Sequence, residues 1–265
     1  NSCVLFVDIR NSVQLIKDKQ DRTMGRLYSV FTHCMLLAAR QEGGLVRNII
    51  GDRVMIVFPQ DHCCTKAVNC AITINHIAML INKKIDNLDF KCGIGIDYGR
   101  MRVMKVGVVT KGAENDDNKG LVWVGYPANF ASRLTDCANK EFTDIMYQVD
   151  ATFYHYNLWG DNTLLGFKPS GWYRETQKLT AEELAKSLVV KTIGYGSALS
   201  VTKCINPVSI NRIEEKYKYD AILVSDAVYK GFKKENPNDN SILENWWKVQ
   251  KRSIRDIEFD VWGAN

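Results

Sequence analysis

Two aspartates, Asp8 and Asp52, each lie at the end of a short apolar run. Asp8 closes the run Val4–Asp8, and Asp52 follows Gly51 between two strand-like segments. A two-residue Gly-Asp connection between such runs is typical of a tight β-hairpin. Paired carboxylates on rigid strands suit Mg²⁺ or Mn²⁺, because these hard cations prefer oxygen ligands. Either aspartate alone could simply end a strand or fill a turn, so the surrounding elements decide the interpretation.

The elements around these aspartates alternate in a recognisable order. In sequence they are the strand Val4–Asp8, a helix over about 14–40, the hairpin Leu45–Phe58, a helix over about 63–84 and the strand Lys91–Asp97. The second helix has apolar residues at alternating steps of four and three, which give one apolar stripe. The βαββαβ order predicts an α+β, ferredoxin-like core with an extended mixed sheet, whose first and third strands are neighbours. Two converging carboxylates there could hold two metal ions for phosphoryl or nucleotidyl transfer.

A second pair of candidate residues follows a polar loop at 110–120. The strand Leu121–Val124 leads into a predicted helix with Pro127 in its first turn, where a missing N–H costs nothing. Asn129 and Arg133 are four residues apart in this helix and so share a face. An amide and a guanidinium on one face could contact ribose and phosphate, or could form a surface hydrogen-bonded pair.

The later part of the chain, 153–219, carries clustered aromatic residues with Gly and Pro around 159–174. This composition predicts a loop-rich variable insertion within a single domain covering 1–265. Thr180 and Glu183 have the spacing of a capping box at a helix start. After the insertion, 221–230 predicts a strand leading into a helix, and Glu258–Trp262 predicts a final strand.

The composition of the 265 residues is ordinary for a globular protein, with 46% hydrophobic residues and a formal net charge of +5. This charge would help to attract a nucleoside triphosphate, while the absence of a Lys/Arg run argues against nucleic acid as a partner. No apolar run approaches the roughly 20 residues of a membrane span. The eight cysteines contain no C-x-x-C pair, which predicts reduced thiols in a cytoplasmic protein. The four histidines are scattered, which argues against a zinc site.

Five segments, spread over most of the chain, resemble the catalytic domain of class III nucleotidyl cyclases in the family's own order. They are Val4–Ile9, Gly44–Phe58, Cys92–Gly99, Val124–Leu134 and Ala221–Tyr229. The strand before Gly125 and the variable later region are similar to the Pycsar pyrimidine cyclases of bacterial anti-phage defence.

The resemblance implies a role for each matching position in the first half of the chain. Asp8 and Asp52 match the two metal-binding aspartates, and the Ile9 carbonyl would be a further ligand. The turn from Ile9 to Ser12 matches the segment whose backbone amides bind phosphate at a helix N-terminus. Asn11 departs from the family pattern, because glycine is frequent at this position.

The resemblance also implies a catalytic pair and a dimer. Asn129 would orient the ribose, and Arg133 would stabilise charge on the α-phosphate in the transition state. In this family the aspartates and the Asn/Arg pair of one site come from different protomers, so a head-to-tail homodimer would hold two shared sites. Lys251, Arg252 or Arg255 would supply a further phosphate contact.

The two positions that select the base in this family are occupied by Asn48 and Val122. The family uses Lys and Asp for adenine, and Glu with Cys or a similar residue for guanine, so neither purine pair is present. Val122 offers no hydrogen bond, whereas the amide of Asn48 can both donate and accept. This favours a pyrimidine, with UTP preferred over CTP.

The resemblance therefore implies a Mg²⁺- or Mn²⁺-dependent lyase that makes a 3′,5′-cyclic pyrimidine nucleotide, cUMP or cCMP, and releases pyrophosphate. Its product would be a second messenger in antiviral defence, read by a separate effector protein. The alternatives are an adenylate cyclase with unusual base recognition, a catalytically inactive nucleotide-binding domain, and a palm-type polymerase or dinucleotide cyclase. The Asn129/Arg133 helix and the lack of a Gly-Gly-Asp-Glu-Phe hairpin argue against the last.

Overall fold

The structure is a computed structural model that describes residues 1–10, 21–59, 61–85, 89–107, 119–155, 171–193, 196–201, 204–250, 254, 257 and 259–265. The chain divides into two compact units. Unit 1 comprises Asn1–Lys140 and Lys218–Asn265, and unit 2 comprises Glu141–Tyr217. Each unit is described by itself below.

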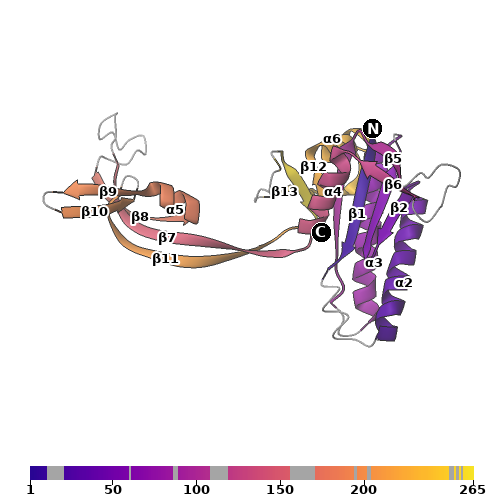
Figure 1. The fold of residues 1–265 in the computed structure, drawn as a ribbon, viewed down its shortest axis with the longest axis horizontal. Helices are drawn as coiled ribbons and strands as arrows, with labels where there is room; N and C mark the ends of the chain where they lie inside the picture. Colours follow the sequence, from indigo (N-terminus) through magenta and orange to yellow (C-terminus); the bar gives the residue numbers. More distant parts are fainter. Residues whose placement is uncertain are drawn as a thin grey trace. The chain divides into compact units, whose positions relative to one another are not determined.

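Unit 1 is an α+β unit built on one seven-stranded mixed sheet (Figure 1). Its elements in chain order are β1 (Ser2–Ile9), α2 (Asp21–Gln41), β2 (Leu45–Ile50), β3 (Arg53–Phe58), α3 (Cys63–Lys84), β4 (Cys92–Gly99), β5 (Arg102–Gly107), β6 (Lys119–Val124), α4 (Tyr126–Cys137), β12 (Ile222–Ser225), α6 (Asp226–Glu235), α7 (Asn240–Leu243), β13 (Lys248–Val249) and β14 (Val261–Ala264). The strand order is β13-β14-β12-β4-β1-β3-β2, and β5 pairs with β6 in a separate ribbon. The predicted βαββαβ core and the neighbouring first and third strands are confirmed.

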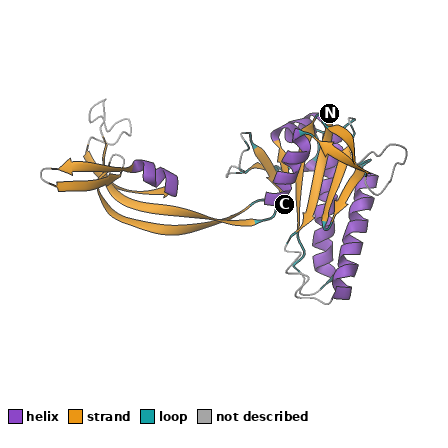
Figure 2. Ribbon diagram, viewed as in Figure 1, coloured by secondary structure: helices purple, strands orange, loops and turns teal. Residues whose placement is uncertain are grey.

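Strand alternation gives the sheet two different faces. On one face Leu5 and Val7 of β1 join the main hydrophobic core with α2, α3 and α6. On the other face Val4 packs with Ala128 and Ala131 of α4. Figure 2 shows the long helices α2 and α3 beside the sheet strands. Because side chains on a strand alternate between faces, the even-numbered residues of β1, Asp8 among them, belong to the α4 face.

Helix α4 approaches the backbone of β4 very closely. A Cβ added at Gly95 would overlap the carbonyl oxygen of Ala131 and the Thr135 backbone nitrogen. A Cβ at Gly93 would lie 2.5 Å from the carbonyl oxygen of Ala138 and would overlap the Arg10 guanidinium. These two glycines thus allow the helix that carries the candidate catalytic pair to lie directly on the sheet.

Most predicted elements of unit 1 appear with small changes of their ends. The helix over 63–84 is found as predicted, and 14–20 lie outside the described residues. The final strand is Val261–Ala264 instead of Glu258–Trp262. In the described part of the chain, α3 is one helix whose length and apolar composition would suit a membrane span. Part of its apolar surface, including Ala67, Ala71 and Ile74, is buried in the main core, whereas Met79 and Leu80 are exposed.

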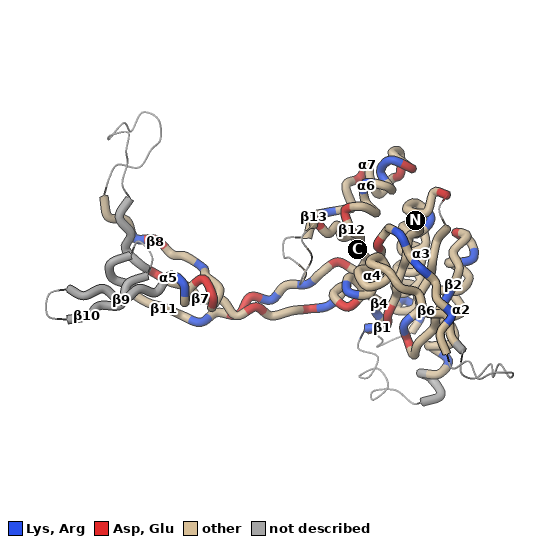
Figure 3. Tube along the Cα trace, turned by 45° about the horizontal axis from the view of Figure 1, so that its top comes forward, with Lys and Arg blue, Asp and Glu red and all other residues tan. Residues whose placement is uncertain are grey.

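Unit 2 is richer in strands than the sequence predicts. Its elements are β7 (Glu141–His155), β8 (Gly171–Thr180), α5 (Ala181–Ser187), β9 (Leu188–Ile193), β10 (Gly196–Val201) and β11 (Cys204–Lys218, whose last residue belongs to unit 1). The strands β11, β7 and β8 form one sheet, and β9 pairs with β10. Acidic and basic residues are interspersed along β7 and β11 (Figure 3). The compact unit in this region is 141–217, which overlaps most of the predicted insertion at 153–219, and 171–174 are strand instead of loop.

The predicted capping box is confirmed at the start of α5. The Thr180 N–H donates to Glu183 Oε2 at 2.8 Å, and the Glu183 N–H donates to Thr180 Oγ1 at 3.2 Å. These reciprocal bonds satisfy backbone donors that a helix N-terminus leaves unpaired.

Candidate active site

Asp8 and Asp52 lie at the same end of the sheet. Asp8 is the penultimate residue of β1, and Asp52 belongs to the two-residue turn that joins β2 to β3. Gly51 takes φ 60° in this turn, and Ile50 pairs with Arg53 across it, as expected for the predicted hairpin. The antiparallel register of β1 and β3 pairs Val7 with Val54. Extending this register by one residue places Asp8 opposite Arg53. Asp52 is the next residue beyond Arg53, on the side of the turn.

Two arginines bind the Asp8 carboxylate, and we refer to Asp8, Arg10 and Arg53 as the guanidinium clamp. Asp8 Oδ2 accepts hydrogen bonds from Arg53 Nη2 at 3.0 Å and from Arg10 Nη1 at 3.3 Å. The Asp8 side chain is only 17% exposed, so this pair of contacts is protected from solvent. Burial lowers the pKa of the Arg53 guanidinium, but its hydrogen bonds to Asp136 and Asp8 outweigh this effect and leave the pKa above its ordinary value.

The two arginines of the guanidinium clamp also contact the C-terminal half of α4. Arg53 Nη1 donates to Ser132 Oγ at 3.0 Å, and its Nη2 also contacts the Asp136 carboxylate. Arg10 Nε donates to the carbonyl oxygen of Ala138 at 2.8 Å, and its Nη2 donates to that of Thr135. Cationic donors at the last carbonyls of a helix satisfy acceptors that have no partner within the helix. Asp8 is therefore connected to α4 through two separate arginines.

The candidate catalytic pair lies on the same helix, nearer its N-terminus. Asn129 and Arg133 are both on the exposed face of α4, one turn apart as predicted. The Arg133 guanidinium carbon lies 5.9 Å from the centroid of the Phe130 ring. Asn129 precedes Asp136 by seven residues, or about 10 Å along the helix axis. The Arg53 contacts on α4 extend from Ser132, three residues after Asn129, to Asp136.

The two candidate base positions lie on β2 and β6. A β-bulge in β2 falls between Val46 and Asn48, and it leaves Arg47 as the extra residue. Asn48 is then opposite Met55, which belongs to the α4 face of the sheet. The Arg47 guanidinium carbon lies 5.2 Å from the centroid of the Trp123 ring, next to Val122. This cation–π contact links the strands that carry Asn48 and Val122.

The oxygen atoms near Asp8 and Asp52 suit a hard divalent cation. Among the described residues, Asp52 makes no hydrogen bond or ion pair, and both arginines on Asp8 bind the same oxygen, Oδ2. Carboxylate oxygens that remain available, together with the Ile9 carbonyl, form the donor set that Mg²⁺ and Mn²⁺ prefer. The remaining predicted contacts, Asn11, Ser12, Lys251, Arg252 and Arg255, lie outside the described residues.

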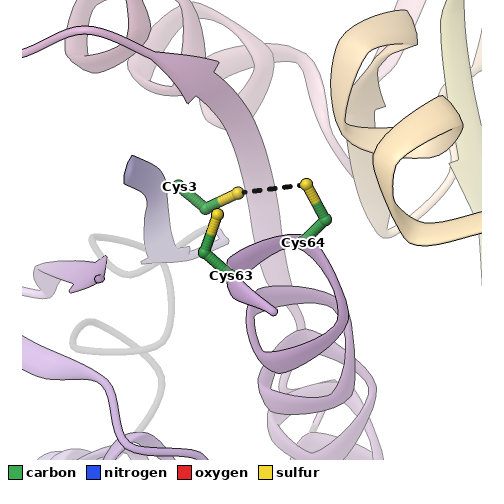
Figure 4. Close-up of side chains that lie close together, drawn as sticks. All are labelled: Cys3, Cys63 and Cys64. Carbon is green, nitrogen blue, oxygen red and sulfur yellow. Dashed lines mark hydrogen bonds between the residues drawn. The ribbon is translucent and has the colours of Figure 1, made fainter. Parts of the chain in front are cut away.

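A cluster of thiols lies behind β1, on the opposite face from Asp8. The Cys3 Sγ donates to the Cys64 Sγ at 3.6 Å, and Cys63 completes a buried group whose sulfur atoms lie within 4.8 Å of one another (Figure 4). Hydrogen bonds donated by Cys3 and Cys64 lower the pKa of Cys63, while the hydrogen bonds that Cys3 donates to Cys63 and Cys64 raise the pKa of Cys3. The seven cysteines whose side chains are described are all free thiols. The cluster belongs to the main hydrophobic core.

Sequence reasoning missed Arg10, Arg53 and their contacts on α4. One signal was present, since Arg10 follows Asp8 by two residues and Arg53 directly follows Asp52. Surface arginines are common, however, and only the packing of α4 on β4 brings Ser132 and Asp136 to these side chains.

Comparison with known proteins finds sequence relatives that are named uridylate cyclases. No protein-family model matches the chain. A uridylate cyclase of Burkholderia cepacia is 31% identical over 143 residues, which are 52% of this chain and 59% of the relative. A uridylate cyclase of Gulbenkiania mobilis is 30% identical over 156 residues, which are 54% of this chain and 58% of the relative. The match thus spans less than two thirds of the length of these curated relatives.

Comparison with solved structures shows the fold. A bacterial light-regulated adenylyl cyclase aligns with a TM-score of 0.54 at 13% identity, covering 100% of this chain and 89% of that one. The catalytic core of a rhodopsin-guanylyl cyclase with converted specificity, in complex with ATPαS, aligns with a TM-score of 0.51 at 13% identity, covering 100% and 95%. The chain is thus a relative of bacterial uridylate cyclases and has the fold of a class III nucleotidyl cyclase catalytic domain.

Proposed function

We propose that this chain is a metal-dependent nucleotide cyclase that converts a pyrimidine nucleoside triphosphate, UTP in preference to CTP, to its 3′,5′-cyclic monophosphate. The observation that carries the proposal is the pair Asn48 and Val122, which offers no purine-selective group in a relative of uridylate cyclases. The Arg47–Trp123 contact supports a common role for these two positions, because it joins the strands on which they lie.

The proposed chemistry assigns one task to each residue. Asp8, Asp52 and the Ile9 carbonyl would hold two Mg²⁺ or Mn²⁺ ions, which would neutralise triphosphate charge and activate the ribose 3′-hydroxyl. Asn129 orients the ribose, so that the 3′-oxygen gives up its proton to water and bonds to the α-phosphorus as the bond to the bridging oxygen breaks and pyrophosphate leaves. Arg133 stabilises the charge that develops on the α-phosphate oxygens.

The active unit in this proposal is a head-to-tail homodimer with two shared sites. In this proposal each site takes Asp8 and Asp52 from one protomer and Asn129 and Arg133 from the other, as in the family that the chain resembles. An apolar surface suited to such a partner is exposed on β2, β5 and β6. Its large side chains are Leu45, Ile49, Ile50, Val103, Met104, Val106, Leu121, Val122 and Val124. Exposed large apolar side chains in such numbers are common at protein interfaces.

The cellular role follows from the product in this proposal. A cyclic pyrimidine nucleotide would act as a second messenger in anti-phage defence and would need a separate effector to read it. The free thiols fit the reducing cytoplasm, where such signalling would take place.

A product assay tests the proposed activity directly. The purified protein is incubated with Mn²⁺ and ATP, GTP, CTP or UTP in separate reactions, and products are identified by mass spectrometry. We expect cUMP as the dominant product and none from Arg133→Ala. Dominant cAMP or cGMP would contradict the base assignment and favour the adenylate cyclase alternative, while no product at dimeric concentrations would favour an inactive nucleotide-binding domain.

A further inference from the structure

We infer that Arg53 is a positioning residue of the proposed reaction: it holds the Asp8 carboxylate and helix α4 in a fixed relation to each other. Its guanidinium bridges Asp8 Oδ2 at 3.0 Å and Ser132 Oγ at 3.0 Å, and it also contacts the Asp136 carboxylate. Asp8 is the proposed metal ligand, and Ser132 directly precedes the proposed catalytic residue Arg133. The inference rests on the proposed function. One of its two tests measures catalysis, and the other measures Mn²⁺ binding without turnover.

The shape of an arginine side chain is what this bridge requires. A guanidinium presents several N–H donors in a rigid planar fork, so one side chain can bind partners on two elements at once. Arg53 uses one terminal nitrogen for Ser132 and the other for Asp8 and Asp136. A lysine at this position would keep the charge but lose the fork.

The bridge leaves Asp8 able to bind a cation. Arg10 and Arg53 both donate to Oδ2, and the described residues give Oδ1 no hydrogen-bond partner. A hydrogen bond to the second oxygen of a ligating carboxylate fixes its orientation, and loss of such an outer partner typically lowers metal affinity by about 10–100-fold. Asp136 offsets the positive charge that Arg53 brings to the site.

The dimer gives this bridge a second consequence. In the proposed arrangement, Asp8 serves one active site, while α4 of the same protomer serves the other. Arg53 therefore contacts the metal-binding half of one site and the helix of the other site. Its two roles can be separated by placing a substitution in only one chain of a mixed dimer.

The first experiment measures metal binding without turnover. Mn²⁺ binding is followed by electron paramagnetic resonance, with and without 3′-deoxy-UTP, which lacks the attacking hydroxyl. We expect Arg53→Gln to weaken Mn²⁺ binding by about 10–100-fold, and Arg53→Lys to recover only part of it. Arg212→Gln is the matched control, because Arg212 is an exposed arginine of unit 2 paired with Glu214 at 3.0 Å. Unchanged Mn²⁺ affinity in a folded Arg53→Gln dimer, or no Mn²⁺ binding by the wild type, would overturn the inference.

The second experiment uses mixed dimers of Asp8→Ala and Arg133→Ala chains, in which one site keeps all its groups. We add Arg53→Gln either to the Arg133→Ala chain, which supplies Asp8, or to the Asp8→Ala chain, which supplies α4. The first placement should lower kcat and raise the Mn²⁺ concentration needed for half-maximal rate, whereas the second, in a chain that already lacks the Asp8 carboxylate, should leave that Mn²⁺ concentration unchanged. Identical effects of the two placements would indicate a merely structural role and would reject the inference.

The outcomes also separate this inference from the proposed function. If the parental mixture is inactive although mixed dimers form, the shared-site proposal fails. The inference about Arg53 is then tested by the Mn²⁺ titration alone. If the parental mixture is active and Arg53→Gln changes neither quantity, the inference fails while the proposed function stands.

Discussion

The Asp97 carboxyl group is buried on β4, with 3% of the residue exposed. Burial raises its pKa above the ordinary value of 3.8, and hydrogen bonds from Ser225 and from the Tyr98 N–H offset this only in part. The folded protein thus holds this proton more tightly than the unfolded chain does. The stabilising contribution of Asp97 therefore falls as pH rises from the unfolded pKa through the raised folded pKa, and it stays low above that.

We accordingly expect Asp97→Asn to stabilise the protein at neutral pH. An amide keeps the shape and both hydrogen bonds without a buried charge, so the free energy of unfolding should rise by about 1 kcal/mol at pH 7. Because asparagine does not titrate, the gain should shrink as pH falls toward 4. The gain in free energy of unfolding is measured by urea denaturation at several pH values, with Asp89→Asn, at an exposed position, as the control. A variant less stable than the wild type at every pH would contradict the prediction.

At the residue scale, the sequence predicted individual candidates better than their partners. Asp8 and Asp52 were identifiable because each follows an apolar run, which is a local signal. Arg10 and Arg53 were not, because a charged side chain in a sequence gives no indication of the carboxylate that it will meet. Asp97 likewise appears polar in sequence, and only the pairing of β4 with β1 and β12 buries it.

At the scale of elements, the contact between α4 and β4 is the one that places the candidate catalytic pair, Asn129 and Arg133. Gly95 gives the backbone of α4 room, because an added methyl group would overlap Ala131 and Thr135. The hairpin at Gly51 and the capping box at Thr180 were predictable from neighbouring residues alone. The α4–β4 approach was not, since it joins segments that are far apart in the chain.

Substitution of Gly95 by alanine should therefore be costly. The overlap with α4 backbone atoms should lower the free energy of unfolding by about 1–3 kcal/mol, as overpacking commonly does, and should displace Asn129 and Arg133. Gly120→Ala on β6 is the matched control, since an added Cβ there meets no atom within 4 Å. Thermal melting and product formation are measured for both variants. Equal melting temperatures for the two would show that α4 does not pack on Gly95.

At the scale of the whole molecule, unit 2 leaves and re-enters unit 1 at adjacent points. The Tyr219 N–H donates to the Lys140 carbonyl oxygen at 3.3 Å, and the Asn139 N–H donates to that of Asp220 at 2.9 Å. The main hydrophobic core is made of residues from unit 1. The strands of unit 2 escaped sequence prediction because they pair mainly with one another over long, charge-rich stretches.

Unit 2 should therefore be removable. Replacement of 143–215 by a short Gly-containing turn should leave unit 1 folded, with a circular dichroism spectrum and cooperative melting like those of the parent after allowance for the lost strands. Cyclic nucleotide formation in vitro should stay within a few fold of the full chain. A truncated protein that unfolds or aggregates would show that unit 1 depends on unit 2.

The division of unit 1 into two stretches of sequence has a consequence for synthesis on the ribosome. Strand β4 ends at Gly99, but its parallel neighbour β12 begins only at Ile222, after residues 100–221, which include all of unit 2. At about 5–20 residues per second, this is a delay of roughly 6–24 s. During that interval one edge of β4 has no strand to pair with, so the nascent chain carries an open apolar edge that invites aggregation. Chaperone demand in a heterologous host should thus depend on how quickly unit 2 is translated.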